Sequence, residues 1–255
     1  QAEDGIRDDI SCLVGSEMCI RDRASSTSGS TDLLEALDVE VELDGAGVAA
    51  CVRDAAVGFA FARMFHPAMR HAAPVRAELG VPTVFNLLGP LSHPGRVGHQ
   101  VIGVSDPARV DLVAAALAAH GTHRSWVVHG HDGLDEVTTT APTTVVEVAG
   151  HEEVRRFEID PVSAGVARAA VADIRIGDPS QNAEAANAML EGAKGPIRDM
   201  VVLNAAAGLV VSGVVRELPE GVDSAAHAID SGGAASTLGK LVAASRAIQG
   251  AASGD

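Results

Sequence analysis

The sequence is poor in aromatic residues and in cysteine. Its 255 residues include no Tyr, one Trp and five Phe. The three cysteines, Cys12, Cys19 and Cys51, have no metal-ligand spacing and do not suggest a disulfide framework. No apolar run reaches the length of about 20 residues that a membrane-spanning helix needs, and no secretory signal is visible. We therefore expect no membrane partner and a reduced, cytoplasmic location.

Positive charge is also scarce. The chain has 19 Lys and Arg residues against 34 Asp and Glu residues, a formal net charge of −15. A nucleic-acid-binding protein needs clustered Lys and Arg side chains to contact phosphates, so we expect no nucleic-acid partner. An anionic substrate would have to be held by backbone N–H groups, by a few cations or by a metal ion.

The hydrophobic content of 47% is enough for one substantial core, or for one and a half domains. Residues 1–23 differ from the rest because they show no period of 2 or 3.6 and contain two of the three cysteines. They resemble translated sequencing-adapter read-through, and the alternative is a disordered natural N-terminus. We leave this segment out of the fold prediction.

A regular alternation of strands and helices begins near residue 99. A strand at 101–104, a helix at 107–119 and a strand at 125–128 form a βαβ unit, which implies a parallel pair and a right-handed crossover. The predicted fold class is α/β, with a central, mostly parallel sheet that is flanked by helices. The other predicted elements are strands at 39–43, 57–61, 143–148 and 154–159, and helices at 45–53, 181–192, 196–211, 221–231 and 234–249.

The stretch 129–140 holds the main candidate site. It follows the apolar run 126–128, which reads as a buried strand, and its glycines and polar residues read as a loop at the carboxyl end of that strand. Ligands of open α/β sheets bind at such strand ends. Asp135 and Glu136 are adjacent oxygen ligands of the kind that Mg²⁺ prefers. The alternative is a solvated acidic loop.

A second candidate is the Ser/Gly-rich loop at 24–30, which leads into a helix that ends near residue 37. Ser30 or Thr31 is the predicted N-cap of this helix. Hydroxyls and backbone N–H groups at a helix start can hold a phosphate, although a capped helix start explains the same pattern. Further along, 66–80 and 83–91 read as two short helices, with Pro74 breaking or kinking the first.

Several motifs together resemble anthranilate phosphoribosyltransferases, and the resemblance covers residues 24–255. The segments that carry it are 25–37, His-Pro-Ala-Met at 66–69, the run 74–91, Gly-Leu-Asp-Glu-Val-Thr-Thr-Thr at 133–140, Arg-Asp-Met-Val-Val-Leu-Asn-Ala-Ala at 198–206 and Ile-Asp-Ser-Gly at 229–232. The resemblance implies transfer of a phosphoribosyl group from phosphoribosyl pyrophosphate to anthranilate in tryptophan biosynthesis, with Mg²⁺, by a homodimer. It also implies a nucleoside-phosphorylase-like α/β domain at 24–65 and 93–255, with 66–92 belonging to a helical domain.

The resemblance also assigns individual residues. It implies that Asp135 and Glu136 bind Mg²⁺ and that no general base is needed, because the amine of anthranilate is already a free nucleophile. The residues that match family contacts to the two substrates are Ser25, Ser26 and Ser30 for phosphoribosyl pyrophosphate, and Arg76 and His66 for anthranilate. A guanidinium such as that of Arg76 suits two-point recognition of a carboxylate.

Three family segments have no counterpart in the sequence: a Gly-Thr-Gly-Gly-Asp loop, an Asn-x-Ser-Thr segment and a Lys-His-Gly-Asn stretch. We therefore expect a truncated form with little activity of its own, a folded remnant of the enzyme. Two other readings remain open, a pyrimidine-nucleoside-phosphorylase-like enzyme and a non-catalytic relative that binds nucleic acid. The first lacks recognisable phosphate contacts in 66–91, and the net charge opposes the second.

Overall fold

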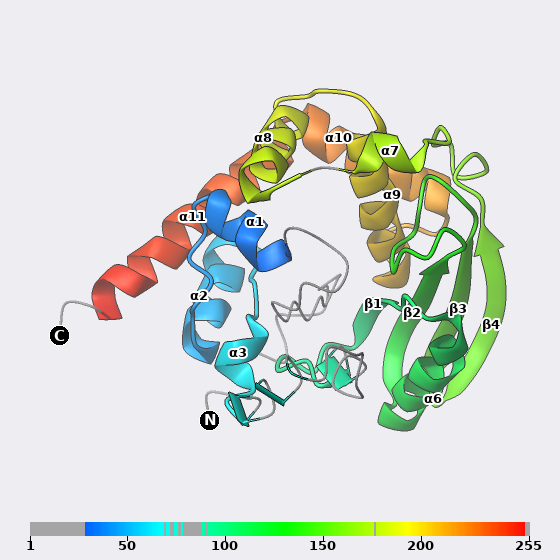
Figure 1. Cartoon of the computed structure of the whole chain (residues 1–255), viewed down its shortest axis with the longest axis horizontal. Coiled ribbons are helices and arrows are strands. Elements are labelled where there is room, and N and C mark those ends of the chain that lie inside the picture. The colour runs from blue at the N-terminus through cyan, green and yellow to red at the C-terminus, as the bar shows by residue number, and fades with distance from the viewer. Residues whose placement is uncertain are drawn as a thin grey trace. The chain divides into compact units, whose positions relative to one another are not determined.

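The structure is a computed structural model that describes residues 29–68, 70–71, 74–75, 78, 88–89, 91–175 and 177–252 (Figure 1). The predictions for 1–23, Ser25, Ser26 and Arg76, and most of those for the helices at 66–80 and 83–91, lie outside the described residues. The chain divides into two compact units, which are described separately. Their described parts are a sheet unit, Gly95–Arg175 with Gly192–Ser231, and a helix unit, drawn from Glu17–Pro94, Ile176–Glu191 and Gly232–Asp255.

The predicted domains, 24–65 with 93–255 and a helical segment at 66–92, stay a prediction. By their contacts, residues 177–191 and 232–252 belong to the helix unit. Few residues of 66–92 are described, so the assignment of this segment to a helical domain stays a prediction.

The sheet unit contains four strands in the order β1-β2-β3-β4 (Figure 1). These strands are β1 (His99–Gly103), β2 (Thr122–Gly130), β3 (Thr143–Gly150) and β4 (Glu152–Ile159). β1 and β2 are parallel and are joined through the 3-10 helix η1 (Pro107–Arg109) and α6 (Val110–His120), which confirms the predicted βαβ unit.

The α/β class is confirmed, but the described sheet is not mostly parallel. β2 pairs with β3, and β3 with β4, in antiparallel fashion. For β3 and β4 the reason is local, because a tight turn in which Gly150 adopts a φ of 62° joins them, and a parallel pair needs a much longer crossover. The strand pair predicted around Gly150 is therefore confirmed as a hairpin.

Two helices pack on the sheet. α9 (Pro196–Val211) shares a core with the strands that includes Trp126, Val128, Val145, Leu203 and Ala207. Because successive side chains of a strand point to opposite faces, the residues between these, such as Val127, turn to the other face. α6 packs on β2, β3 and β4. The unit also contains α7 (Val171–Ile174) and α10 (Leu218–Asp230), and α10 packs against α9.

The described part of the helix unit contains α1 (Ser30–Ala36), α2 (Gly45–Ala55), α3 (Ala62–Phe65), α8 (Pro179–Leu190) and α11 (Gly233–Ala252). α2 packs against α11, and α1 against α8. Asp44 caps α2 by accepting a 2.8 Å hydrogen bond from the N–H of Gly47, and Ala56 ends it in the left-handed conformation. In the part of the chain that the structure describes, no helix is both long and apolar enough to cross a membrane.

Two predicted strands, 39–43 and 57–61, are not strands in the structure. Val39, Val41 and Leu43 are buried in alternation as the pattern predicted, but among the described residues this segment pairs with no strand. The N–H of Glu40 donates instead to the Ser245 hydroxyl at 3.1 Å. A third prediction also needs correction, because the N-cap of α1 is Gly29 and not Ser30 or Thr31.

Candidate functional site

The loop at 131–142 follows directly after β2, as predicted. It begins with a tight turn in which the N–H of Gly133 donates to the carbonyl of Gly130, while the N–H of Gly130 donates to the carbonyl of Leu134, each at 2.8 Å. The turn therefore fixes the start of the loop at the carboxyl end of the strand.

The end of the neighbouring strand β1 touches the same loop. A Cβ atom placed on Gly103 would lie 1.7 Å from the carbonyl oxygen of Asp135. Only glycine allows two backbone segments to approach this closely. Since β1 and β2 are parallel, their carboxyl ends meet at one edge of the sheet, and the backbone of Asp135 rests against that edge.

Asp132 organises the interior of the loop. One of its carboxylate oxygens accepts hydrogen bonds from the hydroxyls of Thr138, at 2.6 Å, and of Thr140, and the other accepts from the N–H of Leu134 at 3.1 Å. Burial alone would raise the pKa of Asp132, but these hydrogen bonds outweigh it and hold the pKa below its usual value. The carboxylate is therefore held in its charged form by the hydrogen bonds that fix the loop.

The second half of the loop is fixed by neighbouring backbone and hydroxyl groups. The N–H of Thr138 donates to the hydroxyl of Thr143 at the start of β3, and the carbonyl of Thr139 accepts from the N–H of Ala169, each at 3.0 Å. Thr138, Thr139 and Thr143 are completely buried. The run of threonines is therefore part of the framework of the loop.

Asp135 and Glu136 occupy the part of the loop that reaches solvent. Asp135 is exposed and Glu136 is half-buried. Of the described residues, none forms a hydrogen bond or an ion pair with the Asp135 carboxylate. Within the same part of the chain, no three His, Cys, Asp or Glu side chains gather closely enough to hold a metal ion by themselves. The loop thus offers a pair of carboxylates and would leave most of a metal's coordination shell to other ligands.

The other predicted site residues that the structure describes lie in the helix unit. Ser30 is the first residue of α1 and is half-buried; the preceding Gly29 donates its N–H to the Asp32 carboxylate at 3.1 Å. His66 directly follows α3 and lies near His93. Burial lowers the pKa of His93, and electrostatic repulsion from the His66 side chain lowers it further. Ser25, Ser26 and Arg76 lie outside the described residues.

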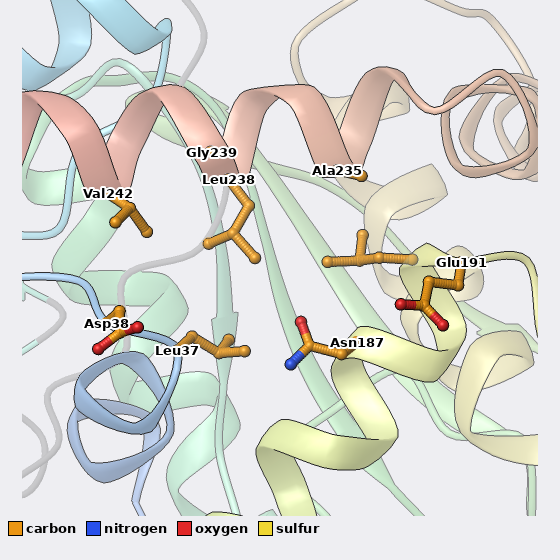
Figure 2. A pocket seen from close by; sticks show the side chains of 9 residues that line it. Leu37, Asp38, Asn187, Glu191, Ala235, Leu238, Gly239 and Val242 are labelled. Carbon is orange, nitrogen blue, oxygen red and sulfur yellow. The ribbon is translucent and has the colours of Figure 1, made fainter.

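The helix unit also has a hollow of about 350 Å³. Figure 2 shows that Leu238 and Val242 of α11 line it on one side, and Leu37 and Asn187 on the other. Of the predicted site residues that the structure describes, none lines this hollow, and the lining gives no indication of a ligand.

Sequence reasoning identified the acidic pair but not the residues that fix it. Asp132 belongs to the loop predicted from the sequence. The sequence sign of its role in holding the loop was the presence of two hydroxyl residues two positions apart, Thr138 and Thr140. Gly103 gave no comparable signal. It contacts Asp135, which lies 32 residues later in the chain, and this contact forms only when β1 pairs with β2.

Comparison with known proteins places the chain in a family. The family model described as "Glycosyl transferase family, a/b domain" matches residues 20–235. The chain is 50% identical, over 222 residues, to anthranilate phosphoribosyltransferase of Parvibaculum lavamentivorans, and the match covers 87% of this chain and 65% of that protein. The chain therefore spans about 65% of the length of this curated relative.

Solved structures give the same result. The crystal structure of anthranilate phosphoribosyltransferase from Thermus thermophilus matches with a TM-score of 0.80 and 43% identity, over 86% of this chain and 64% of that one. The Saccharomyces cerevisiae enzyme in complex with PRPP and Mg matches with a TM-score of 0.76 and 28% identity, over 86% and 63%. The chain therefore belongs to the glycosyl transferase family, and it is similar to those members that are named anthranilate phosphoribosyltransferases.

Proposed function

We propose that this chain carries out, or forms part of an enzyme that carries out, transfer of the phosphoribosyl group from phosphoribosyl pyrophosphate to anthranilate. The observation that carries the proposal is the Asp135–Glu136 pair, fixed on a loop at the carboxyl ends of β1 and β2. This loop lies within a chain that is 50% identical to an anthranilate phosphoribosyltransferase. A yeast relative was solved with PRPP and Mg.

The donor set of the loop fits Mg²⁺. This ion binds through one or two carboxylates and takes its remaining ligands from substrate phosphates and water. Asp135 and Glu136 supply two carboxylates, and no third acidic or histidine ligand gathers with them among the described residues. When bound, Mg²⁺ would neutralise charge on the departing pyrophosphate.

The chain's own contribution is to hold these carboxylates still. Gly103 and the Asp132 hydrogen bonds fix the backbone on either side of the pair, so little conformational freedom is lost when a ligand binds. No general base is assigned, because the anthranilate amine can attack without losing a proton first. Positioning and charge neutralisation then carry the reaction.

The substrates are assigned to residues on the strength of the family resemblance. In our proposal Ser25, Ser26 and Ser30 donate to phosphoribosyl pyrophosphate, whereas Arg76 and His66 contact anthranilate. We also propose a cytoplasmic homodimer. The buried, free thiol of Cys51 supports a reducing compartment.

The test is an assay for the fluorescence of phosphoribosylanthranilate. It should use the chain itself and the chain joined to the part of the Parvibaculum relative that it does not match. The double variant Asp135→Asn/Glu136→Gln should lower turnover at least about 100-fold, because charge stabilisation of this kind is worth that much.

A matched control is Glu152→Gln/Glu153→Gln on β4, which removes the same charge from exposed positions. This control should keep wild-type turnover. Equal turnover in both double variants would contradict the metal-binding role of the loop. Absence of turnover in both the chain and the joined protein would contradict the proposed reaction.

A further inference from the structure

Helix α9 reaches the acidic loop through the side chain of Asn204. Its Oδ1 atom accepts a hydrogen bond from the N–H of Val137 at 3.0 Å, and its Nδ2 atom donates to the carbonyl of the same residue at 2.9 Å. Nδ2 also donates to the carbonyl of Met200, one turn earlier in α9, at 2.9 Å. The amide is therefore oriented by its own helix and binds both backbone polar groups of one residue in the loop.

The residue that Asn204 binds is the one that follows the acidic pair. Val137 is 0% exposed, so water cannot replace the two hydrogen bonds that its backbone makes. Buried backbone N–H and C=O groups are almost always paired, and the pairing of Val137 comes from a residue 67 positions away. Asn204 therefore fixes the backbone immediately after Glu136.

We infer that Asn204 is a positioning residue for Asp135 and Glu136, acting through the backbone of Val137. The inference rests on the proposed function, because it assigns these carboxylates to a metal ion. With the Gly103 contact at Asp135 and the Asn204 contacts at Val137, the pair is held from both sides. Asparagine is required because the position needs one donor and one acceptor at a fixed spacing; aspartate lacks the donor, and glutamine is one methylene longer.

The test compares three variants of the full chain with the wild type. Asn204→Asp keeps the shape of the side chain but removes the donor, and Asn204→Ser keeps one hydroxyl and leaves space for water. Ala205→Ser, at the neighbouring exposed position of α9, is the matched control. Circular dichroism tests whether each variant is folded. If Asn204→Asp does not fold, Asn204→Ser alone tests the inference.

Two measurements that do not depend on activity follow. Hydrogen exchange of the Val137 amide should become at least about tenfold faster in Asn204→Ser, which loses the Oδ1 acceptor, whereas Asn204→Asp keeps an acceptor for this N–H. Mn²⁺ binding in the presence of inorganic pyrophosphate, followed by electron paramagnetic resonance, should weaken about 10- to 100-fold in both Asn204 variants. Ala205→Ser should behave as wild type.

Unchanged exchange at Val137 and unchanged Mn²⁺ affinity in folded Asn204 variants would overturn the inference. Failure of the proposed function gives a different result. In that case Asp135→Asn/Glu136→Gln would bind Mn²⁺ as well as the wild type does, while hydrogen exchange would still decide whether Asn204 holds the loop. A variant with faster hydrogen exchange of the Val137 amide but normal Mn²⁺ binding would also refute the inference. The Asn204 hydrogen bonds would then stabilise the loop without affecting the metal ligands.

Discussion

The carboxylate of Asp132 and the hydroxyl of Thr138 lie 2.6 Å apart, and their hydrogen bond closes the loop that carries Asp135 and Glu136. A charged acceptor with several donors forms stronger hydrogen bonds than a neutral one. Asp132 thus stabilises the loop.

Replacing Asp132 with Asn should destabilise the protein by about 1–3 kcal/mol at neutral pH, the range for hydrogen bonds to charged groups. Because the pKa of Asp132 is lowered by folding, its contribution is present above the unfolded pKa of about 3.9 and is lost as the pH falls through the lower folded pKa. Urea unfolding at pH 7 and near pH 3 should therefore show a gap between variant and wild type that narrows in acid. A gap of equal size at both pH values would contradict this account.

Two glycine substitutions should have opposite signs. Gly103→Ala places a methyl group 1.7 Å from the Asp135 carbonyl, so the strand end or the acidic loop must move. We expect a loss of several kcal/mol, or misfolding, because overpacking at a rigid contact typically costs about 1–3 kcal/mol or more. Gly239→Ala, in α11 and with nothing within 4 Å of the added atom, should instead stabilise by about 0.5–1 kcal/mol. Thermal unfolding monitored by circular dichroism measures both, and a stable Gly103→Ala variant would disprove the close approach.

The buried carboxylate of Glu147 accepts hydrogen bonds from Arg124 at 3.0 Å, Trp126 at 3.2 Å and Arg155 at 2.9 Å. Burial alone would raise the pKa of Glu147, but hydrogen bonds from the two arginines, the charge of Arg124 and the indole N–H bring it below the usual value. Glu147→Gln should therefore cost about 2–3 kcal/mol at pH 7, a discounted value because both arginines are partly exposed.

The pH dependence of this contribution has the same sign as that of Asp132. It is present above the unfolded pKa of about 4.3 and disappears as the pH falls through the lower folded pKa. Trp126 is the only tryptophan and is 2% exposed, so its emission follows unfolding directly. Glu158→Gln, an exposed change on β4, is the control and should shift stability by less than about 0.5 kcal/mol.

Cys51 should be unreactive while the protein is folded. It is 1% exposed, burial raises the pKa of its thiol, and the negative charge of Asp54 raises it further. Since the thiolate is the reactive form, modification by a disulfide reagent at pH 7 should require unfolding. The measurement uses a Cys12→Ser/Cys19→Ser background, so that only Cys51 reports. Rapid modification under native conditions would show that this part of the helix unit opens easily.

The sequence predicted those parts of the fold that depend on neighbouring residues. The βαβ unit, the hairpin at Gly150 and α9, whose observed limits equal the predicted 196–211, all follow from local periodicity and turn residues. The segment at 39–43 shows the limit of this approach. Its alternating burial was predicted correctly, but a strand also needs a partner, and Ser245 takes up the Glu40 N–H instead.

The same distinction applies to the candidate site. Asp135 and Glu136 were visible because two adjacent carboxylates in a loop after a strand are a local pattern. Asn204 was not, because within a run of small apolar residues it gives no sign that its partner lies 67 positions earlier. Candidate ligand-binding residues can thus be read from a short stretch of sequence, whereas residues that hold them in place depend on tertiary structure.

β4 is the last strand in the order of the described sheet, and its composition bears on how the protein behaves at high concentration. A strand at a sheet edge can pair with the same strand of another molecule and so begin aggregation. If two copies of β4 paired antiparallel about the centre between Arg155 and Arg156, arginine would face arginine, and Glu153 would face Glu158. Such like-charge pairs oppose that symmetric register, so the charges of β4 protect the sheet edge from one of its simplest routes to self-association.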